Sequence, residues 1–210
     1  MTDLPSTAFR RQDETPDEQF YRQPRFVTHI DEGAIAAVTQ LYREFLPSEG
    51  RILDLMSSWV SHLPDEVHYR EVVGLGLNAR ELAANPRLTR AVVQNLNTTP
   101  LLPFESHTFD AAGCTVSIDY LTDPVTVLRD LGRVLMPGGP VVISFSNRCF
   151  PTKAVEVWHR LDDAGHLALV QQYLEAAGNW TDIVALDRSP TVNGQRRGDP
   201  LFAVVGRARS

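Results

Sequence analysis

The chain has 210 residues, 43% of them hydrophobic, which is enough apolar material for one core and predicts one compact domain. Its net charge of −6 and its pI near 5.5 provide no broad positive field, so we expect a small-molecule substrate and exclude duplex nucleic acid and anionic membranes as main partners. The two cysteines have neither metal-ligand nor disulfide spacing, and the sequence shows neither a membrane-spanning apolar run nor a secretion signal. We therefore expect a cytoplasmic protein without a metal ion, and the oligomeric state is left open.

The first part of the chain divides into a tail and a segment that leads into a helix. Residues 1–18 are polar, contain several acidic residues and prolines and show no periodicity, which predicts a flexible tail. A single domain is predicted for residues 19–210, and residues 19–50 are expected to form an N-terminal lid segment and helix. Asp31 is the predicted N-cap of that helix, which Pro47 ends.

From Arg51 onward, strands and helices alternate along the chain. The apolar runs "RILDL", "REVVGLGL", "RAVVQNL", "TFDAAGCTVSI" and "GPVVISFSN" are typical of strands that are buried on both faces. Helices are predicted between them over 79–85 and 123–135, and a further helix is predicted from about 163 to 178. This alternation indicates parallel strands joined by crossover helices.

The C-terminal stretch breaks the parallel pattern. "WTDIVALD" and "PLFAVVGRA" are predicted strands, and the polar linker "RSPTVNGQRRGD" between them is too short for a crossover helix, so the pair must be antiparallel. The predicted fold class is α/β, a three-layer Rossmann-like sandwich with a seven-stranded, mostly parallel sheet and an antiparallel last strand.

This architecture, together with several motifs, resembles the class I S-adenosylmethionine-dependent methyltransferases. "PLLPFESHTFD" and "RVLMPGGPVVISF" are similar to that family's approach to its fourth strand and to its turn into the fifth, and the resemblance covers about residues 30–207. The combination of "LDLMSSWVSHLP", "GLN" and "SFSNR" resembles a subgroup of methyltransferase-like proteins. The resemblance implies S-adenosyl-L-methionine as cofactor and methyl transfer as the reaction.

The first cofactor turn departs from the family pattern. With Asp54 aligned on the acidic residue that begins the family's glycine-rich turn, Met56, Ser58 and Val60 occupy the positions of its three glycines. We expect a compressed turn and a short helix that ends at Pro64, with Ser57 or Ser58 capping it and offering a hydroxyl to an anion. Trp59 and His62 then lie near the cofactor; the alternative is that Trp59 fills core space and His62 lies at the surface.

Two further departures replace acidic residues by smaller or neutral ones. Gly76 stands where the family has an acidic residue for the ribose hydroxyls, and Asn78 follows two residues later. Asn95 stands where the family often has an aspartate for the adenine amino group. The alternative role for both asparagines is local turn capping, and for Cys114 that of a small buried residue. The cofactor-binding residues that the resemblance implies are Asp54, Met56, Ser57, Ser58, Trp59, Gly76, Asn78, Asn95, Leu96, Cys114 and Thr115.

Acceptor-binding residues are expected at the same sheet edge, because open α/β sheets bind ligands at the carboxyl ends of their strands. The candidate catalytic residues are His29, Tyr21 and Asn147, with His29 and Tyr21 as possible general bases. Arg25, Arg148 and Tyr120 are the candidate substrate-binding residues, although isolated arginines are also common on solvated surfaces.

Two functions remain open at the level of the sequence. The first is an S-adenosylmethionine-dependent methyltransferase that acts on a small-molecule acceptor by in-line transfer. The alternative is a non-catalytic methyltransferase-like protein that binds a ligand or partner through a degenerate cofactor site. A nicotinamide-dependent dehydrogenase is disfavoured, because no Gly-x-Gly-x-x-Gly follows the first strand.

Overall fold

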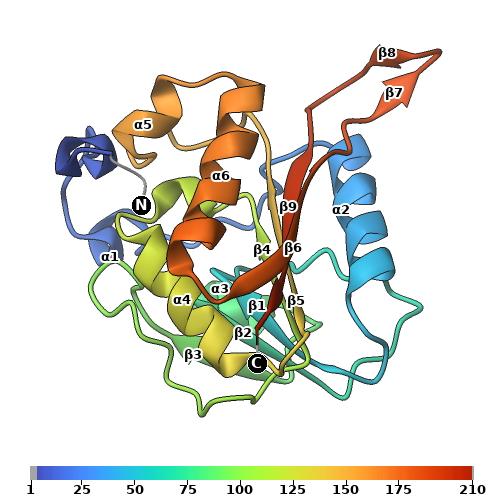
Figure 1. The fold of residues 1–210 in the computed structure, drawn as a ribbon. Helices are drawn as coiled ribbons and strands as arrows, with labels where there is room; N and C mark the ends of the chain where they lie inside the picture. Colours follow the sequence, from blue (N-terminus) through green and yellow to red (C-terminus); the bar gives the residue numbers. More distant parts are fainter. Residues whose placement is uncertain (1–3, 210) are drawn as a thin grey trace.

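A twisted seven-stranded sheet forms the centre of the molecule in the computed structural model, which describes residues 4–209 (Figure 1). The strands lie in the spatial order β3-β2-β1-β4-β5-β9-β6. β9 runs antiparallel to its neighbours β5 and β6. The other pairs in the sheet, from β3-β2 to β4-β5, are parallel. The fold is therefore the predicted mostly parallel α/β sheet with an antiparallel last strand. The strands are β1 (Arg51–Leu55), β2 (Glu71–Gly76), β3 (Arg90–Val93), β4 (Ala111–Thr115), β5 (Pro140–Phe145), β6 (Trp180–Asp187) and β9 (Phe202–Ala208).

Helices cover both faces of the sheet, which gives three layers (Figure 1). α2 (Glu32–Phe45) covers one face, and α4 (Pro124–Val134) and α6 (Asp163–Ala177) cover the other. The remaining helical elements are short: η1 (Ser6–Phe9), α1 (Asp17–Phe20), α3 (Ala79–Ala84), η2 (Ile118–Tyr120) and α5 (Glu156–His159). A hairpin of β7 (Thr191–Val192) and β8 (Gln195–Arg196) projects from the linker between β6 and β9.

The period of two along the strands divides the core into two clusters. Leu53 and Leu55 pack with α4 and α6, whereas Ile52, which directly precedes Leu53, points to the opposite face and packs with α2. β3 differs from the prediction of a strand buried on both faces, because it lies at the edge of the sheet and most of its side chains are exposed. None of the described helices is long and apolar enough to cross a membrane.

Local capping sets the ends of the long helices. Asp31, Asp123 and Asp162 each accept a hydrogen bond from a backbone N–H in the first turn of α2, α4 and α6, respectively. Gly178 ends α6 in the left-handed conformation, with φ of 83°.

The short helix predicted after the first strand does not form. Residues 56–64, which we call the 56–64 loop, follow an irregular path. Met56 and His62 have φ of 56° and 53°, in the left-handed region that a right-handed helix excludes. The crossover between β1 and β2 therefore contains no helix, and the serines have other partners than a helix terminus.

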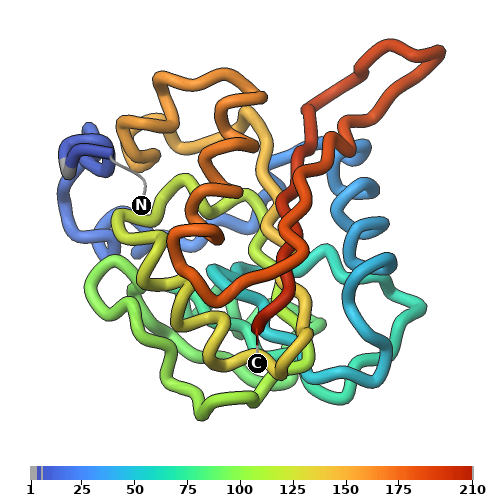
Figure 2. Tube along the Cα trace, viewed as in Figure 1, coloured from blue at the N-terminus to red at the C-terminus, as the bar shows by residue number. Residues whose placement is uncertain are grey.

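Residues 4–18, part of the predicted flexible tail, contact the rest of the molecule, whereas residues 1–3 of that tail lie outside the described residues. Lys153, which is completely buried, donates hydrogen bonds to the Asp13 and Thr15 carbonyl oxygens. The same amine lies 3.3 Å from the Asp17 carboxylate, which also accepts from Arg11 at 2.7 Å. Long-range polar contacts of this kind, which composition does not reveal, hold the segment against the molecule. Figure 2 follows the chain (blue) onward from α1 to α2.

Candidate active site

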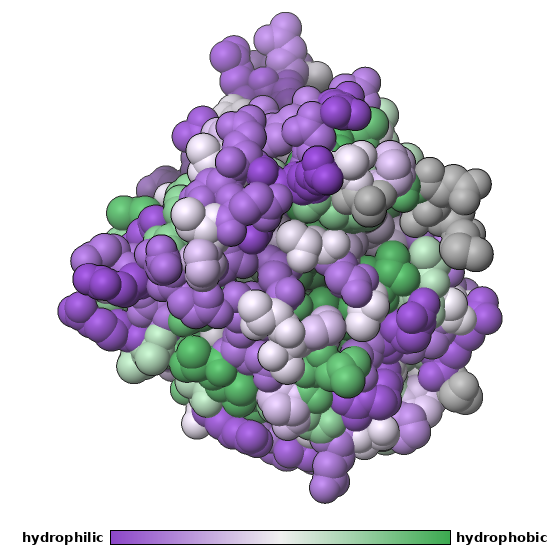
Figure 3. All heavy atoms as spheres, turned by 90° about the vertical axis from the view of Figure 1, so that its left-hand side faces the viewer, coloured by the Kyte–Doolittle hydropathy of each residue, from purple (hydrophilic) through white to green (hydrophobic). Residues whose placement is uncertain are grey.

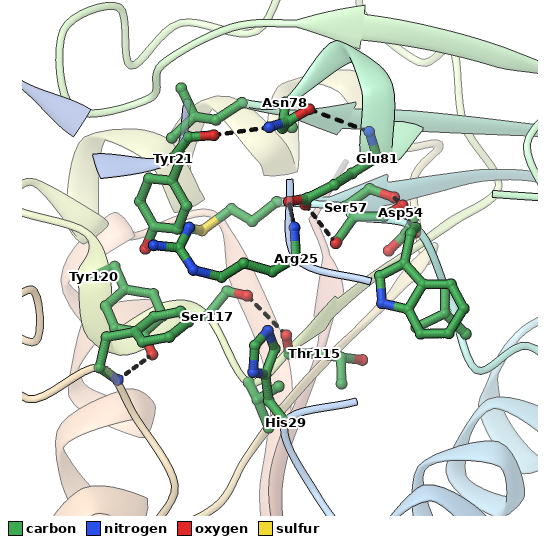
Figure 4. Close-up of a pocket in the computed structure, with 18 of the residues that line it drawn as sticks. Tyr21, Arg25, His29, Asp54, Ser57, Asn78, Glu81, Thr115, Ser117 and Tyr120 are labelled. Carbon is green, nitrogen blue, oxygen red and sulfur yellow. Dashed lines mark hydrogen bonds between the residues drawn. The ribbon is translucent and has the colours of Figure 1, made fainter. Parts of the chain in front are cut away.

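A cavity of about 390 Å³ opens at the carboxyl ends of the central parallel strands. Figure 4 shows the labelled side chains around it, with Asn78 and Glu81 on one side and His29, Thr115 and Ser117 on the opposite side. Figure 3 shows one outer face of the molecule, where hydrophilic side chains (purple) cover most of the area and apolar side chains (green) lie in small separate groups. The cavity lies at the edge of the sheet where open α/β folds bind ligands.

Asp54 organises the 56–64 loop from the end of β1. Its Oδ2 accepts hydrogen bonds from the Ser57 and Ser61 hydroxyls at 2.5 and 2.6 Å. Asn85 ties the loop from the other side, because its Nδ2 donates to Ser61 Oγ and to the Ser58 carbonyl oxygen. Burial raises the pKa of Asp54 to about 6, although the two serine hydrogen bonds oppose that rise. Serines thus shape the turn in which the family resemblance leads one to expect glycines.

The loop packs directly on the end of β2. The Ser57 N–H donates to the Leu75 carbonyl oxygen at 2.7 Å, and a β-carbon at Gly76 would collide with the Ser57 carbonyl oxygen. Gly76 is therefore required by the close approach of the loop backbone. An acidic side chain at this position is excluded for the same reason.

The two asparagines at neighbouring strand ends use their carbonyl oxygens locally. Asn78 is the N-cap of α3, and its Oδ1 accepts from the Arg80 and Glu81 N–H groups at 2.9 and 3.2 Å. Asn95 Oδ1 accepts from the Asn97 N–H at 2.9 Å. Both line the cavity, and both also hold the N-terminal segment through their amide N–H groups.

Residues 17–30, which we call the covering segment, close one side of the cavity. Asn78 Nδ2 donates to the Tyr21 carbonyl oxygen at 2.8 Å, and Trp59 Nε1 donates to the Val27 carbonyl oxygen at 3.1 Å. Asn95 Nδ2 donates to Glu18 at 2.8 Å. The residues at the variant cofactor positions therefore contact the covering segment as well as the cavity.

The mouth of the cavity carries the candidate catalytic and acceptor-binding side chains. His29 and Asn147 line it together with His62, and the His29 ring lies 5.1 Å from that of Phe150. Burial lowers the pKa of His29, and burial together with the neighbouring His29 lowers the pKa of His62 to about 4. Burial raises the pKa of Tyr21 well above its usual value. Both imidazoles are therefore neutral at pH 7, whereas the Tyr21 phenol keeps its proton.

Arg25 extends across the cavity without a carboxylate partner among the described residues. Its guanidinium carbon lies 4.6 Å from the centre of the Phe20 ring and 5.1 Å from that of Phe150. Nη2 donates to the Phe20 carbonyl oxygen at 3.1 Å, and the buried Nη1 has no hydrogen-bond partner in the described part of the chain. Arg148, in contrast, is exposed and lies 3.7 Å from the Asp199 carboxylate.

The structure brings nearly all of the predicted site residues to this one cavity. Cys114 is the exception: its side chain is completely buried in the core, because side chains alternate along β4 and Thr115 is the one that faces the cavity. The others that line it are Tyr21, Arg25, His29, Asp54, Met56, Ser57, Ser58, Trp59, Gly76, Asn78, Asn95, Leu96, Thr115, Tyr120, Asn147 and Arg148.

Several further lining residues were not assigned to the site from the sequence, among them Glu81 and Phe150. Glu81 lies in the first turn of α3, three residues after the N-cap Asn78. Its spacing from Asn78 indicates a helix cap and gives no sign of a place in the cavity. Phe150 follows β5 by several residues, and no motif marks it. His62, in contrast, was expected near the cofactor with a surface position as the alternative, and it lines the cavity, where its backbone is left-handed.

Comparison with known proteins indicates a methyltransferase fold. The family model described as "Methyltransferase domain" matches residues 56–143, from the 56–64 loop to β5. The chain therefore has the class I, Rossmann-like methyltransferase fold, and its residues 56–143 are similar to a methyltransferase domain. No curated protein matches its sequence.

Similar solved structures share the fold at low sequence identity. A chain of the complex between the Haloferax volcanii Trm112 methyltransferase activator and the putative methyltransferase has a TM-score of 0.61 at 14% identity, with 92% of this chain and 93% of that chain covered. An S-adenosylmethionine-dependent methyltransferase from Mesorhizobium loti has a TM-score of 0.56 at 18% identity, with 81% and 97% covered. A possible histamine N-methyltransferase from Thermotoga maritima has a TM-score of 0.60 at 14% identity, with 84% and 90% covered.

Proposed function

We propose that the protein is an S-adenosylmethionine-dependent methyltransferase that acts on a small-molecule acceptor in the cytoplasm. The observation that carries the proposal is the covered cavity of about 390 Å³ at the carboxyl ends of the strands of a methyltransferase fold. A volume of this size suits one small molecule and its immediate reaction partner rather than a macromolecule. Two unpaired cysteines are consistent with a reducing compartment.

The chemistry of the cavity fits the proposed cofactor. Arg25 Nη1 is a buried donor without a partner in the described chain, and the cofactor carries a carboxylate that accepts such a bond. Apolar contacts for an adenine ring are available from Met56, Leu77 and Leu96. The residues that would hold the cofactor are therefore these four, together with Ser58, Gly76 and Asn95.

When bound, S-adenosylmethionine would supply an electrophilic methyl group: the acceptor would attack the methyl carbon in line, the carbon–sulfur bond would break, and S-adenosylhomocysteine would leave. The chain's own contribution is to align the acceptor and to exclude water, and the covering segment does both from one side of the cavity. No covalent intermediate with the protein is needed.

His29 is the residue that we assign as the general base. Burial and Arg25 lower the pKa of its imidazole, Glu81 opposes them, and the ring is neutral at pH 7 and ready to accept a proton. The protonated Tyr21 phenol is suited to donate a hydrogen bond instead. Asn147, Tyr120 and the exposed Arg148 line the same mouth and would orient the acceptor.

Binding of S-adenosylhomocysteine to the whole chain tests the proposal. A ligand at about 100 times its Kd adds about 2.7 kcal/mol to the free energy of unfolding, which a thermal shift assay detects. Calorimetry should give a one-to-one complex, and mass spectrometry of metabolites incubated with protein and cofactor should identify the methylated acceptor. Absence of a thermal shift at millimolar ligand would refute the assignment.

A second function is favoured by one specific observation. Both lone pairs of Asn78 Oδ1 are occupied by backbone N–H groups of α3, so this atom is not free to accept from a ribose hydroxyl. A methyltransferase-like protein that binds another ligand or a partner would have the same feature. Saturable S-adenosylhomocysteine binding, followed by methyl transfer, separates the enzyme from this alternative.

A further inference from the structure

Glu81 is a buried carboxylate in the wall of the cavity, with 8% of its surface exposed. Its Oε1 accepts a hydrogen bond from the Arg25 N–H at 2.7 Å, and its Oε2 accepts from the Ser58 hydroxyl at 2.7 Å. Arg25 belongs to the covering segment and Ser58 to the 56–64 loop. One side chain on α3 therefore joins two walls of the cavity that are far apart in the sequence.

The orientation of Glu81 is not the one that its place in α3 favours. It lies three residues after the N-cap Asn78, where a glutamate commonly reaches back to the N–H of the N-cap residue. Here both carboxylate oxygens are turned away from that role, toward Ser58 and Arg25. Among the described residues, no basic side chain lies within ion-pair distance of the carboxylate, so neutral donors satisfy its charge.

The packing around β2 explains why this link comes from α3. Gly76, at the end of β2, cannot carry a side chain because the Ser57 carbonyl oxygen lies against it. The first turn of α3 is the next part of the chain at this edge of the sheet, and it is fixed there by the Asn78 cap. Glu81 is thus the side chain of that turn that reaches the cavity.

We propose that Glu81 is a positioning residue that holds the 56–64 loop and the covering segment in the arrangement that binds the cofactor. The inference rests on the proposed function, because it assigns Glu81 a part in the same cofactor site. It goes beyond that function in identifying a link between loop and covering segment, so that the order of one depends on the order of the other. Loss of the link disorders both walls, and the cofactor then has to order them when it binds.

The Glu81→Ala and Glu81→Gln variants of the full chain separate the outcomes. Glu81→Ala removes the two charge-assisted hydrogen bonds that the carboxylate accepts from Arg25 and Ser58. Bonds of this kind contribute enough that their loss should weaken S-adenosylhomocysteine binding at least about tenfold in calorimetry. Glu81→Gln should bind within about threefold of the unmodified protein, because its amide oxygen still accepts from the Arg25 N–H and its N–H group donates to Ser58 Oγ. Glu32→Ala is the matched control, since it removes an exposed glutamate from the first turn of α2.

Hydrogen exchange at single amides distinguishes a local loss of order in the covering segment from a destabilisation of the whole fold. The Arg25 amide should exchange at least about tenfold faster in Glu81→Ala than in Glu81→Gln and Glu32→Ala, while amides in β4 and β5 keep their protection. Unfolding in urea identifies any variant that fails to fold, and Glu81→Gln then carries the test. Unchanged binding and unchanged Arg25 exchange in Glu81→Ala would overturn the proposal.

Failure of the unmodified protein to bind S-adenosylhomocysteine would refute the proposed function and, with it, the cofactor role of Glu81. The exchange experiment would in that case still show whether Glu81 holds the covering segment. The two failures are therefore distinguishable.

Discussion

Replacing Asp54 by asparagine should make the folding stability less dependent on pH. Asp54 is 7% exposed, and burial raises its pKa from 3.8 to about 6, although hydrogen bonds from Ser57 and Ser61 oppose the rise. The unfolded chain therefore releases this proton at a lower pH than the folded chain does, so the carboxyl makes folding less favourable as pH increases from about 4 to 6. A rise of about two in the pKa lowers the free energy of unfolding above pH 7 by about 3 kcal/mol, relative to a carboxyl whose pKa is the same in both states.

The Asp54→Asn substitution keeps the geometry without the charge, because the amide oxygen still accepts from both serines. The free energy of unfolding of Asp54→Asn minus that of the unmodified protein should increase by about 2.5 kcal/mol between pH 4 and pH 7.5. Urea denaturation of both proteins at several pH values measures this difference, and the comparison cancels the titration of all other groups. A difference that stays constant over this range would show that burial does not govern the ionisation of Asp54.

Further predictions concern the residues that support the cavity. Lys153→Met should lower the free energy of unfolding by about 3 to 5 kcal/mol in urea, because it leaves the buried Asp17 carboxylate with less compensation; a loss below about 1 kcal/mol would contradict this account. Gly76→Ala should destabilise the fold by about 1 to 3 kcal/mol and weaken S-adenosylhomocysteine binding in calorimetry, because the new methyl group displaces the Ser57 carbonyl. Asn78→Ala should cost about 1 kcal/mol through loss of the α3 cap, whereas Asn78→Ser should restore most of that stability in thermal unfolding.

The fold could be predicted from the sequence because its signals are local. The apolar runs that form β1 and β5 are bounded by polar or turn residues, and the linker between β6 and β9 is too short for a parallel connection. The position of β9 between β5 and β6 follows from pairing of strands distant in the chain, which no local pattern specifies.

The candidate site was predictable in location and only partly in detail. Because the carboxyl ends of parallel strands meet at one edge, the sequence alone places residues such as Asp54 and Asn95 together. The helix predicted over the 56–64 loop was wrong, because Asp54 draws Ser57 and Ser61 into hydrogen bonds that a helix would not allow. Glu81 was missed because its partners lie 23 and 56 residues away.

The covering segment is fastened at both of its ends. At one end the Asp17 carboxylate lies between Arg11 and Lys153. At the other, Asp31 and Asp199 exchange reciprocal backbone-to-carboxylate hydrogen bonds of 3.0 and 2.7 Å. Any opening is therefore the bulging of a short tethered loop rather than the departure of a free arm, and the entropic penalty of returning to the closed form is small because the chain ends never separate. Ligand exchange in such a protein should be limited by local breathing of about a dozen residues rather than by refolding of an entire terminus.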